Sequence, residues 1–137
     1  MKILHISDTH GCHRRLHNLP QADIVVHSGD FTMNGSEQEA LDFMNWFCDL
    51  PCPQKIFICG NHDDCLCGAT IDGLDSNIHY GSGELLSRIT TVQPRLHLFG
   101  HIHSQHGTIV LNGTTFSNGA IMNADYSNFR MPNLVEL

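Results

Sequence analysis

The sequence predicts a mixed α/β domain, which we take as one unit over residues 1–137. Three observations predict this class: short apolar runs alternate with segments of helical period, one helical segment begins with a capping sequence, and an Asn-Gly pair separates two strand-like runs. With 137 residues and 41% hydrophobic composition, the chain is long enough to bury a core.

Four short apolar runs predict strands, and each of them ends at a polar block. The predicted strands are Ile3–Ile6, Asp23–His27, Lys55–Cys59 and Leu96–Phe99, and the blocks that follow are Asp8-Thr9-His10, Gly29-Asp30, Gly60-Asn61-His62-Asp63 and Gly100-His101-Ile102-His103. Because open α/β sheets bind ligands outside the carboxyl ends of their strands, we expect the four blocks to converge on one cleft.

The strongest helix signal lies in the first half of the chain. Ser36 and Glu39 form the S-x-x-E pattern of a capping box, and a broad apolar face continues up to Pro51, which ends the helix. A second helix is expected at Glu84–Val92 and a shorter one at Cys12–Leu19. These helices alternate with the predicted strands, as a mixed α/β domain requires.

Toward the C-terminus the pattern changes to alternation with a period of two. Asn112-Gly113 is the signal of a type I′ turn, and the runs on either side, Thr108–Leu111 and Thr114–Ser117, predict the two strands of a hairpin. Leu134–Leu137 is expected to add an edge strand.

The polar blocks offer the ligand chemistry of a metal centre. Their carboxylate, imidazole and amide groups, without a thiolate, suit manganese, iron, zinc or magnesium better than a structural zinc ion. The blocks hold more donors than one ion needs, which indicates two ions. Asp30 is placed to bridge them, because a carboxylate has two oxygens and Gly29 lets the backbone turn sharply before it.

The order and spacing of these blocks resemble the calcineurin-like metallophosphoesterases. The pattern of that family runs D-x-H, G-D, G-N-H-[D/E], a further lone His and G-H-x-H, and four of its five blocks are present between Lys2 and about Asn118. The resemblance implies a two-sheet sandwich flanked by helices (αββα), with metal ions at the strand ends between the sheets. The G-D-F-T block is most similar to a branch of small members like the cyclic-nucleotide phosphodiesterases.

The resemblance also implies a role for each site residue. The implied metal ligands are Asp8, His10 and His103 for one ion, Asp30 as the bridge, and Asn61 and His101 for the second ion. The implied catalytic residues are His62, which protonates the leaving oxygen, and Asp30. The implied activity is that of a divalent-metal-dependent phosphoesterase, more a phosphodiesterase than a monoesterase, that hydrolyses small phosphate esters through a hydroxide bridging two ions, with manganese the foremost metal.

Two departures from the family pattern affect the site. In many relatives a second Asp follows the G-D block and orients the catalytic His, whereas this chain has Met33 there, so His62 needs another orienting group. The segment Asp64–Phe99 is short and lacks the strands and the His loop expected in it. We therefore expect a family member without a central segment near residues 74–84, with His79 as a candidate replacement ligand.

The short centre leaves alternatives open. The first hypothesis is an active phosphoesterase that binds its second ion more weakly than its first, and the alternative is a metal-binding family member with weak or no catalysis. A zinc site built from His62, Cys65 and Cys67 is a third hypothesis. Since loss of strands exposes a sheet edge and apolar surface, a homodimer or a segment swap is also expected.

Composition excludes several classes of partner. The net charge is −7 with only 7 Lys and Arg residues, so there is no basic surface for binding nucleic acid. No apolar run reaches the length of a membrane span, and Met1-Lys2 leads directly into a strand instead of a signal peptide. We expect a cytoplasmic protein whose partner is a small phosphate ester, with bound divalent ions supplying the local positive charge.

Overall fold

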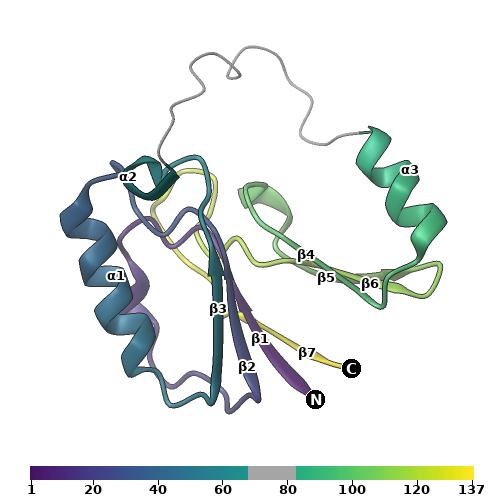
Figure 1. Cartoon of the computed structure of the whole chain (residues 1–137), viewed down its shortest axis with the longest axis horizontal. Coiled ribbons are helices and arrows are strands. Elements are labelled where there is room, and N and C mark those ends of the chain that lie inside the picture. The colour runs from purple at the N-terminus through teal and green to yellow at the C-terminus, as the bar shows by residue number, and fades with distance from the viewer. Residues whose placement is uncertain (68–82) are drawn as a thin grey trace.

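Two β-sheets and a few helices make up the protein (Figure 1). The computed structural model describes residues 1–67 and 83–137, with the side chains of 66, 67 and 83–86 left out of the description. The mixed α/β class with two sheets that the sequence predicts is therefore confirmed. His79 and nearly all of the central segment near residues 74–84 lie outside the described residues.

The larger sheet has four strands in the order β3-β2-β1-β7. These strands are β1 (Lys2–Ile6), β2 (Ile24–Ser28), β3 (Gln54–Ile58) and β7 (Asn133–Glu136). The first three run parallel to one another, and β7 pairs antiparallel with β1 as the predicted edge strand. Parallel pairing brings the carboxyl ends of β1, β2 and β3, with the polar block after each, to the same edge of the sheet.

The smaller sheet has three strands in the order β4-β6-β5, namely β4 (Leu96–Phe99), β5 (Gly107–Leu111) and β6 (Thr114–Asn118). The predicted hairpin is confirmed: Asn112 and Gly113 have φ of 50° and 83°, the left-handed pair that a type I′ turn needs. β4 runs parallel to β6, and a parallel bridge between Ser7 and Ala120 joins the two sheets just beyond β1. The carboxyl end of β4 thereby meets those of the larger sheet.

The long helix α1 (Glu37–Asp49) covers one face of the larger sheet (Figure 1). Ser36 is its N-cap, and the predicted capping box with Glu39 is present. The helix buries aromatic side chains against the aliphatic side chains of β1 and β2, and this cluster includes Leu4, Ile6, Val25, Phe43 and Phe47. Burial of this cluster is the main stabilising contribution on that side of the sheet.

The other helical segments are short. They are α2 (Asp64–Cys67), α3 (Gly83–Val92), and the 3-10 turns at His13–Arg15 and His103–Gln105. α3 lies on the side of the smaller sheet, away from α1 (Figure 1), close to its predicted bounds. The prediction of a helix over Cys12–Leu19 was wrong beyond one turn, because the chain is already extended at Leu16 and left-handed at Asn18.

β3 and β5 are edge strands that carry exposed aliphatic side chains. Ile56 and Ile58 on β3 are 52% and 58% exposed, and Ile109, Val110 and Leu111 on β5 are also exposed. The expected exposed edges are thus present among the described residues, and the homodimer that we infer from them stays a prediction. None of the helices in the described part of the chain has the length and apolarity needed to cross a membrane.

Candidate metal centre

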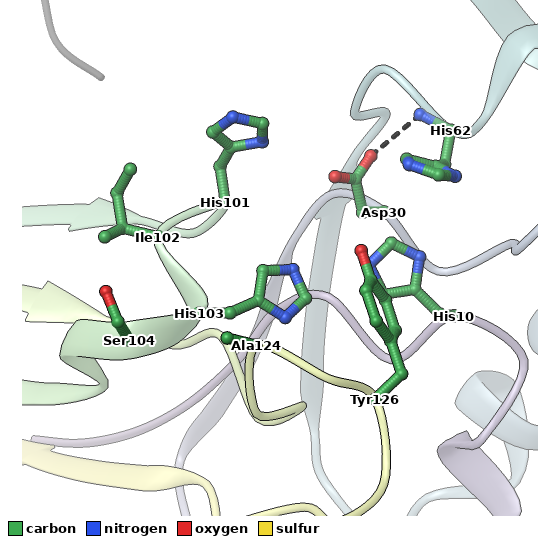
Figure 2. Close-up of a pocket in the computed structure, with 9 residues that line it drawn as sticks. All are labelled: His10, Asp30, His62, His101, Ile102, His103, Ser104, Ala124 and Tyr126. Carbon is green, nitrogen blue, oxygen red and sulfur yellow. Dashed lines mark hydrogen bonds between the residues drawn. The ribbon is translucent and has the colours of Figure 1, made fainter. Parts of the chain in front are cut away.

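A cavity of about 290 Å³ opens where the polar blocks converge. Figure 2 shows the side chains around it, which come from the ends of β1, β2, β3 and β4 and from the loop before β7. The lining residues are His10, Asp30, His62, His101, Ile102, His103, Ser104, Ala124 and Tyr126. Five of the residues that the sequence predicts for the site therefore share one wall, although they are far apart in the chain.

Three of the predicted ligands form a compact donor group at this cavity. One ligand atom each of Asp8, His10 and His103 lies within 4.8 Å of the other two. Asp8 and His10 are buried, and His103 is half-buried. A buried carboxylate between two imidazoles is a donor set typical of a first-row divalent cation.

His10 has its ring fixed in the form that a metal ligand requires. Its Nδ1 lies 3.1 Å from the carbonyl oxygen of Thr32, and since a carbonyl can only accept, Nδ1–H is the donor. The other ring atom, Nε2, is buried and has no hydrogen-bond partner among the described residues. An unprotonated buried nitrogen without a partner fits a cation, so the residues present suit the metal that the donor group implies.

Asp8 is held as a charged carboxylate. Its oxygens accept the backbone N–H of His101 at 3.0 and 2.9 Å, and Nε2 of His103 lies 3.3 Å from Oδ1. Burial by itself raises the pKa of Asp8, but hydrogen bonds with His103, Ser7 and the His101 N–H outweigh it and leave that pKa below its ordinary value. A Cβ on Gly100 would lie 2.2 Å from Oδ2 of Asp8, so only glycine permits this approach of the two loops.

Asp30 lies beside the donor group and faces the same cavity. The group of three does not include it. Its Oδ1 accepts the backbone N–H of His62 at 2.8 Å, as the dashed line in Figure 2 marks, and burial raises its pKa, with the charge of Asp8 adding to the rise. Two buried carboxylates near one another repel, and a divalent cation would relieve that repulsion.

Asp63 organises the loops on which Asp30 and His62 lie. Its Oδ2 accepts the backbone N–H groups of Asp30 at 2.8 Å and Gly60 at 2.9 Å, and its Oδ1 accepts that of Thr32 at 2.9 Å. The side chain is fully buried. Its place in the G-N-H-[D/E] block was visible in the sequence, but its role as a clamp between two loops needed the structure.

His62 is oriented by a main-chain group. Its Nδ1–H donates to the carbonyl oxygen of Met33 at 2.9 Å, at the position where many relatives carry an orienting Asp. Its ring centroid lies 4.7 Å from that of His10. The backbone carbonyl of Met33 therefore orients His62 in place of the aspartate side chain that many relatives carry at this position.

The two residues predicted for the second ion are more exposed than the three residues of the donor group. Asn61 is exposed and does not line the cavity, and His101 lines it but is exposed. The role of both as ligands stays a prediction. For the zinc hypothesis, the side chain of Cys67 lies outside the description, and His62 faces the cavity with Asp30.

Strained backbone is concentrated at the predicted ligands. Asp8, His10, Asp30 and His101 have φ of 54°, 41°, 56° and 69°, the left-handed region that residues other than glycine rarely adopt. Each such residue costs on the order of 1 kcal/mol, and such strain persists where surrounding contacts determine the conformation, as at functional sites.

Sequence reasoning missed Tyr126. It lines the cavity with its ring centroid 5.1 Å from that of His10 and 5.0 Å from that of His103, and its φ is 59°. Burial raises its pKa, and the charges of Asp8 and Asp30 add to the rise. The segment around it has only the composition of a turn, so no signal in the sequence connected it to the site.

Comparison with known proteins finds relatives of this chain in Caenorhabditis elegans and Homo sapiens. The UPF0046 protein K07C11.7 of Caenorhabditis elegans is 25% identical over 207 aligned positions, which cover 90% of this chain and 70% of that protein. The UPF0046 protein C25E10.12 of the same organism is 41% identical over 64 residues, which are 46% of this chain and 23% of that protein. Metallophosphoesterase domain-containing protein 1 of Homo sapiens is 40% identical over 58 residues, 42% of this chain and 18% of that protein.

The longest of these alignments reveals a difference in length. Since 90% of 137 residues is about 123, some 84 of the 207 aligned positions hold residues of the worm protein without a counterpart here. The calcineurin-like phosphoesterase family matches residues 1–115. The chain therefore belongs to that family of metal-dependent phosphoesterases.

Proposed function

We propose that this chain is a divalent-metal-dependent phosphodiesterase that hydrolyses small phosphate esters. The observation that carries the proposal is the donor group of Asp8, His10 and His103, whose two imidazoles line the same cavity as His62. A cation-binding group and an imidazole around one polar space are the parts that hydrolysis of a phosphate ester needs.

One ion would be held by Asp8, His10 and His103 and a second by Asn61 and His101, with Asp30 shared by the two. Manganese is our first choice, and iron, zinc or magnesium also suit oxygen and nitrogen donors. When bound, the ions supply positive charge for the phosphate oxygens and lower the pKa of a water molecule. The compact first donor group and the exposure of Asn61 support tighter binding of the first ion than of the second.

A residue of the chain itself, His62, can supply the proton that the leaving oxygen needs. With Nδ1–H of His62 donated to the carbonyl of Met33, Nε2 is the atom that gains and loses a proton. The ring donates a proton from Nε2 to the leaving oxygen as a general acid. Asp30 holds the loop of His62 in place by accepting its backbone N–H.

Size limits the substrate. A cavity of about 290 Å³ is at the lower end of the range for ligand sites, which supports a small ester. The preference for diesters rests on the likeness of the Gly29-Asp30-Phe31-Thr32 block to the phosphodiesterase-like branch.

The test is hydrolysis of bis(para-nitrophenyl) phosphate with and without Mn²⁺. We expect turnover that requires the metal, is abolished by Asp30→Ala and falls about a hundredfold in His62→Ala. Asp49→Ala and His17→Ala, at exposed positions away from the cavity, are matched controls that should retain full activity. Turnover in Asp30→Ala equal to that of the unchanged chain would contradict the proposal.

The alternative is a family member that binds metal with weak or no catalysis. The exposure of Asn61 and His101 and the shorter length relative to the worm protein favour it. Calorimetry separates the two functions: Mn²⁺ binding that Asp8→Ala removes, together with no turnover of mono- or diesters, would establish the alternative.

We also propose a cytoplasmic location. Cys12, Cys48 and Cys52 are thiols outside any disulfide, which suits a reducing compartment. Fractionation of cells that express the tagged chain checks this, and recovery in a secreted or membrane fraction would contradict it.

A further inference from the structure

Tyr126 is a large aromatic residue at the mouth of the cavity with no role in the proposed reaction so far. It is 41% exposed, so it does not serve the core. Figure 2 shows its ring beside His10, with the phenol oxygen directed toward Asp30. The ring contacts both imidazoles of the donor group, at 5.1 Å and 5.0 Å between centroids, so the side chain faces the space where a metal-bound ligand would sit.

The loop that carries Tyr126 is closed by its own hydrogen bonds. The backbone N–H of Asn123 donates to the carbonyl of Asn128 at 2.9 Å, and that of Asn128 donates to Oδ1 of Asn123 at 2.9 Å. Ser127 donates from Oγ to Oδ1 of Asp125 at 2.6 Å, and the Tyr126 N–H donates to the carbonyl of Asn123 at 3.0 Å. These bonds hold Tyr126 at a positive φ of 59°, so its position is determined by the loop.

The same loop is tied to the metal-ligand loop. Nη1 of Arg130 donates to the carbonyl of His103 at 3.0 Å and to that of Met122 at 3.1 Å. The guanidinium therefore joins the residue that leads into the Tyr126 loop to the backbone of a predicted ligand. This link fixes the phenol relative to the donor group.

A phenol at this place can donate a hydrogen bond into the cavity beside the donor group. Its ordinary pKa is about 10, so it is a neutral O–H donor at neutral pH, whereas the carboxylates can only accept. Bound cations would offset the negative charge of Asp8 and Asp30, and the oxygens of a phosphate group in the cavity would then need hydrogen-bond donors. Tyr126 and His62 line the same cavity.

We propose that Tyr126 is a substrate-binding residue whose O–H donates a hydrogen bond to a phosphate oxygen of the substrate. The inference rests on the proposed function, because it takes a phosphate ester as the ligand. The ring, held by the closed loop, places the donor before the substrate arrives, so binding does not have to order it.

The experiment compares Tyr126→Phe with the unchanged chain, using inorganic phosphate as the probe in the presence of Mn²⁺. Tyr126→Phe keeps the ring and its contacts and removes only the O–H. We expect the affinity for phosphate to fall about tenfold or more, as for a hydrogen bond to a charged acceptor. The affinity for Mn²⁺ alone should stay within about twofold, and Met131→Leu, at an exposed tail position outside the cavity, should change neither value.

Kinetics on the aryl diester supply the second readout. KM should rise with the loss of phosphate affinity while kcat stays nearly constant, since the bond is made in the ground state as well as in the transition state. Unchanged phosphate affinity in Tyr126→Phe would overturn the inference, and so would a parallel loss of Mn²⁺ affinity, which marks a structural role. If the unchanged chain binds Mn²⁺ and phosphate but hydrolyses no ester, the proposed function fails. The difference in phosphate affinity between Tyr126→Phe and the unchanged chain then still tests the role of Tyr126.

Discussion

The two halves of the candidate metal centre are built differently. Asp8, His10 and His103 are at least half-buried and offer ligand atoms within 4.8 Å of one another, and hydrogen bonds with backbone groups fix Asp8 and His10. Asn61 and His101 follow β3 and β4 and are exposed. The comparison teaches that ligands predicted from motifs of the same kind can be preorganised to different degrees, because the three side chains of the donor group are at least half-buried whereas those of Asn61 and His101 are exposed.

The buried histidines of β1 and β2, which lie behind the buried half of the centre, should make the protein sensitive to acid, and this is the largest effect we expect. Burial lowers the pKa of His27 to about 3 and that of His5 to about 4, from 6.5 in the unfolded chain. As the pH falls below 6.5, the unfolded chain binds protons that the fold excludes, so stability is lost through the window from 6.5 down to these folded values. At pH 5 each histidine lowers the free energy of unfolding by about 2 kcal/mol relative to pH 8.

Urea unfolding of the metal-free protein at pH 8, 6.5 and 5 measures this loss. His103 acts in the opposite direction, because its hydrogen bond with Asp8 raises its pKa, and it offsets part of the total. His27→Gln should reduce the pH dependence, and His17→Gln, at an exposed position, should not. Stability that does not change between pH 8 and pH 5 would contradict the neutral buried state of His27.

Metal titration tests the comparison directly. Asp8→Ala should weaken the tighter Mn²⁺ site by more than about a hundredfold, because loss of a direct ligand exceeds the effect of losing a residue that only supports one. Asn61→Ala should change that site by less than about fivefold, since its side chain is exposed and does not line the cavity. Isothermal calorimetry gives both affinities. An equal loss of Mn²⁺ affinity in the two variants would show that the two halves do not differ in preorganisation.

Gly100 gives a test that leaves every ligand in place. A Cβ there would lie 2.0 Å from Oγ of Ser7 and 2.2 Å from Oδ2 of Asp8, so Gly100→Ala should displace the carboxylate and weaken Mn²⁺ binding about tenfold. Gly107→Ala is the matched control, since its Cβ meets nothing within 4 Å although its φ is +135°. The control should lose stability and keep its metal affinity. Equal metal affinities of the two variants would show that crowding at Asp8 does not matter.

The smallest effect is expected on the exposed edge. Ile58→Thr on β3 should change the free energy of unfolding by less than about 0.5 kcal/mol, because the side chain is 58% exposed. Val25→Thr on β2 should cost about 1 to 3 kcal/mol, because it places a hydroxyl in the core. Urea unfolding compares them, and sedimentation of the unchanged chain checks the predicted homodimer. A large loss in Ile58→Thr would show that β3 is covered in solution.

Local features of the fold were predictable because they depend on side-chain type and spacing alone. Asn112-Gly113 requires left-handed backbone, and Ser36 with Glu39 satisfies the free N–H groups of a helix start, whatever surrounds them. The convergence of the polar blocks followed from strand ends in a parallel sheet. The family pattern supplied the residue roles, which still await the experiments above.

Other features depend on contacts that no local pattern encodes. The group that orients His62 is a backbone carbonyl, which every residue carries. The sequence at Met33 therefore showed only that the expected aspartate is absent. Tyr126 reaches His10 across more than a hundred residues by a loop whose composition is ordinary. Whether Asn61 is buried depends on what packs over β3, and that is decided by the whole chain.

The carbonyl that orients His62 has a consequence for how freely this protein can vary. Almost any substitution of an aspartate at position 33 would remove the acceptor for His62, whereas a main-chain carbonyl oxygen is present whatever the side chain. Saturation mutagenesis should therefore find position 33 permissive, with proline excluded because the Met33 N–H donates to Glu39. Because the hydrogen bond that orients His62 is made to the peptide backbone, few natural substitutions at position 33 can break it.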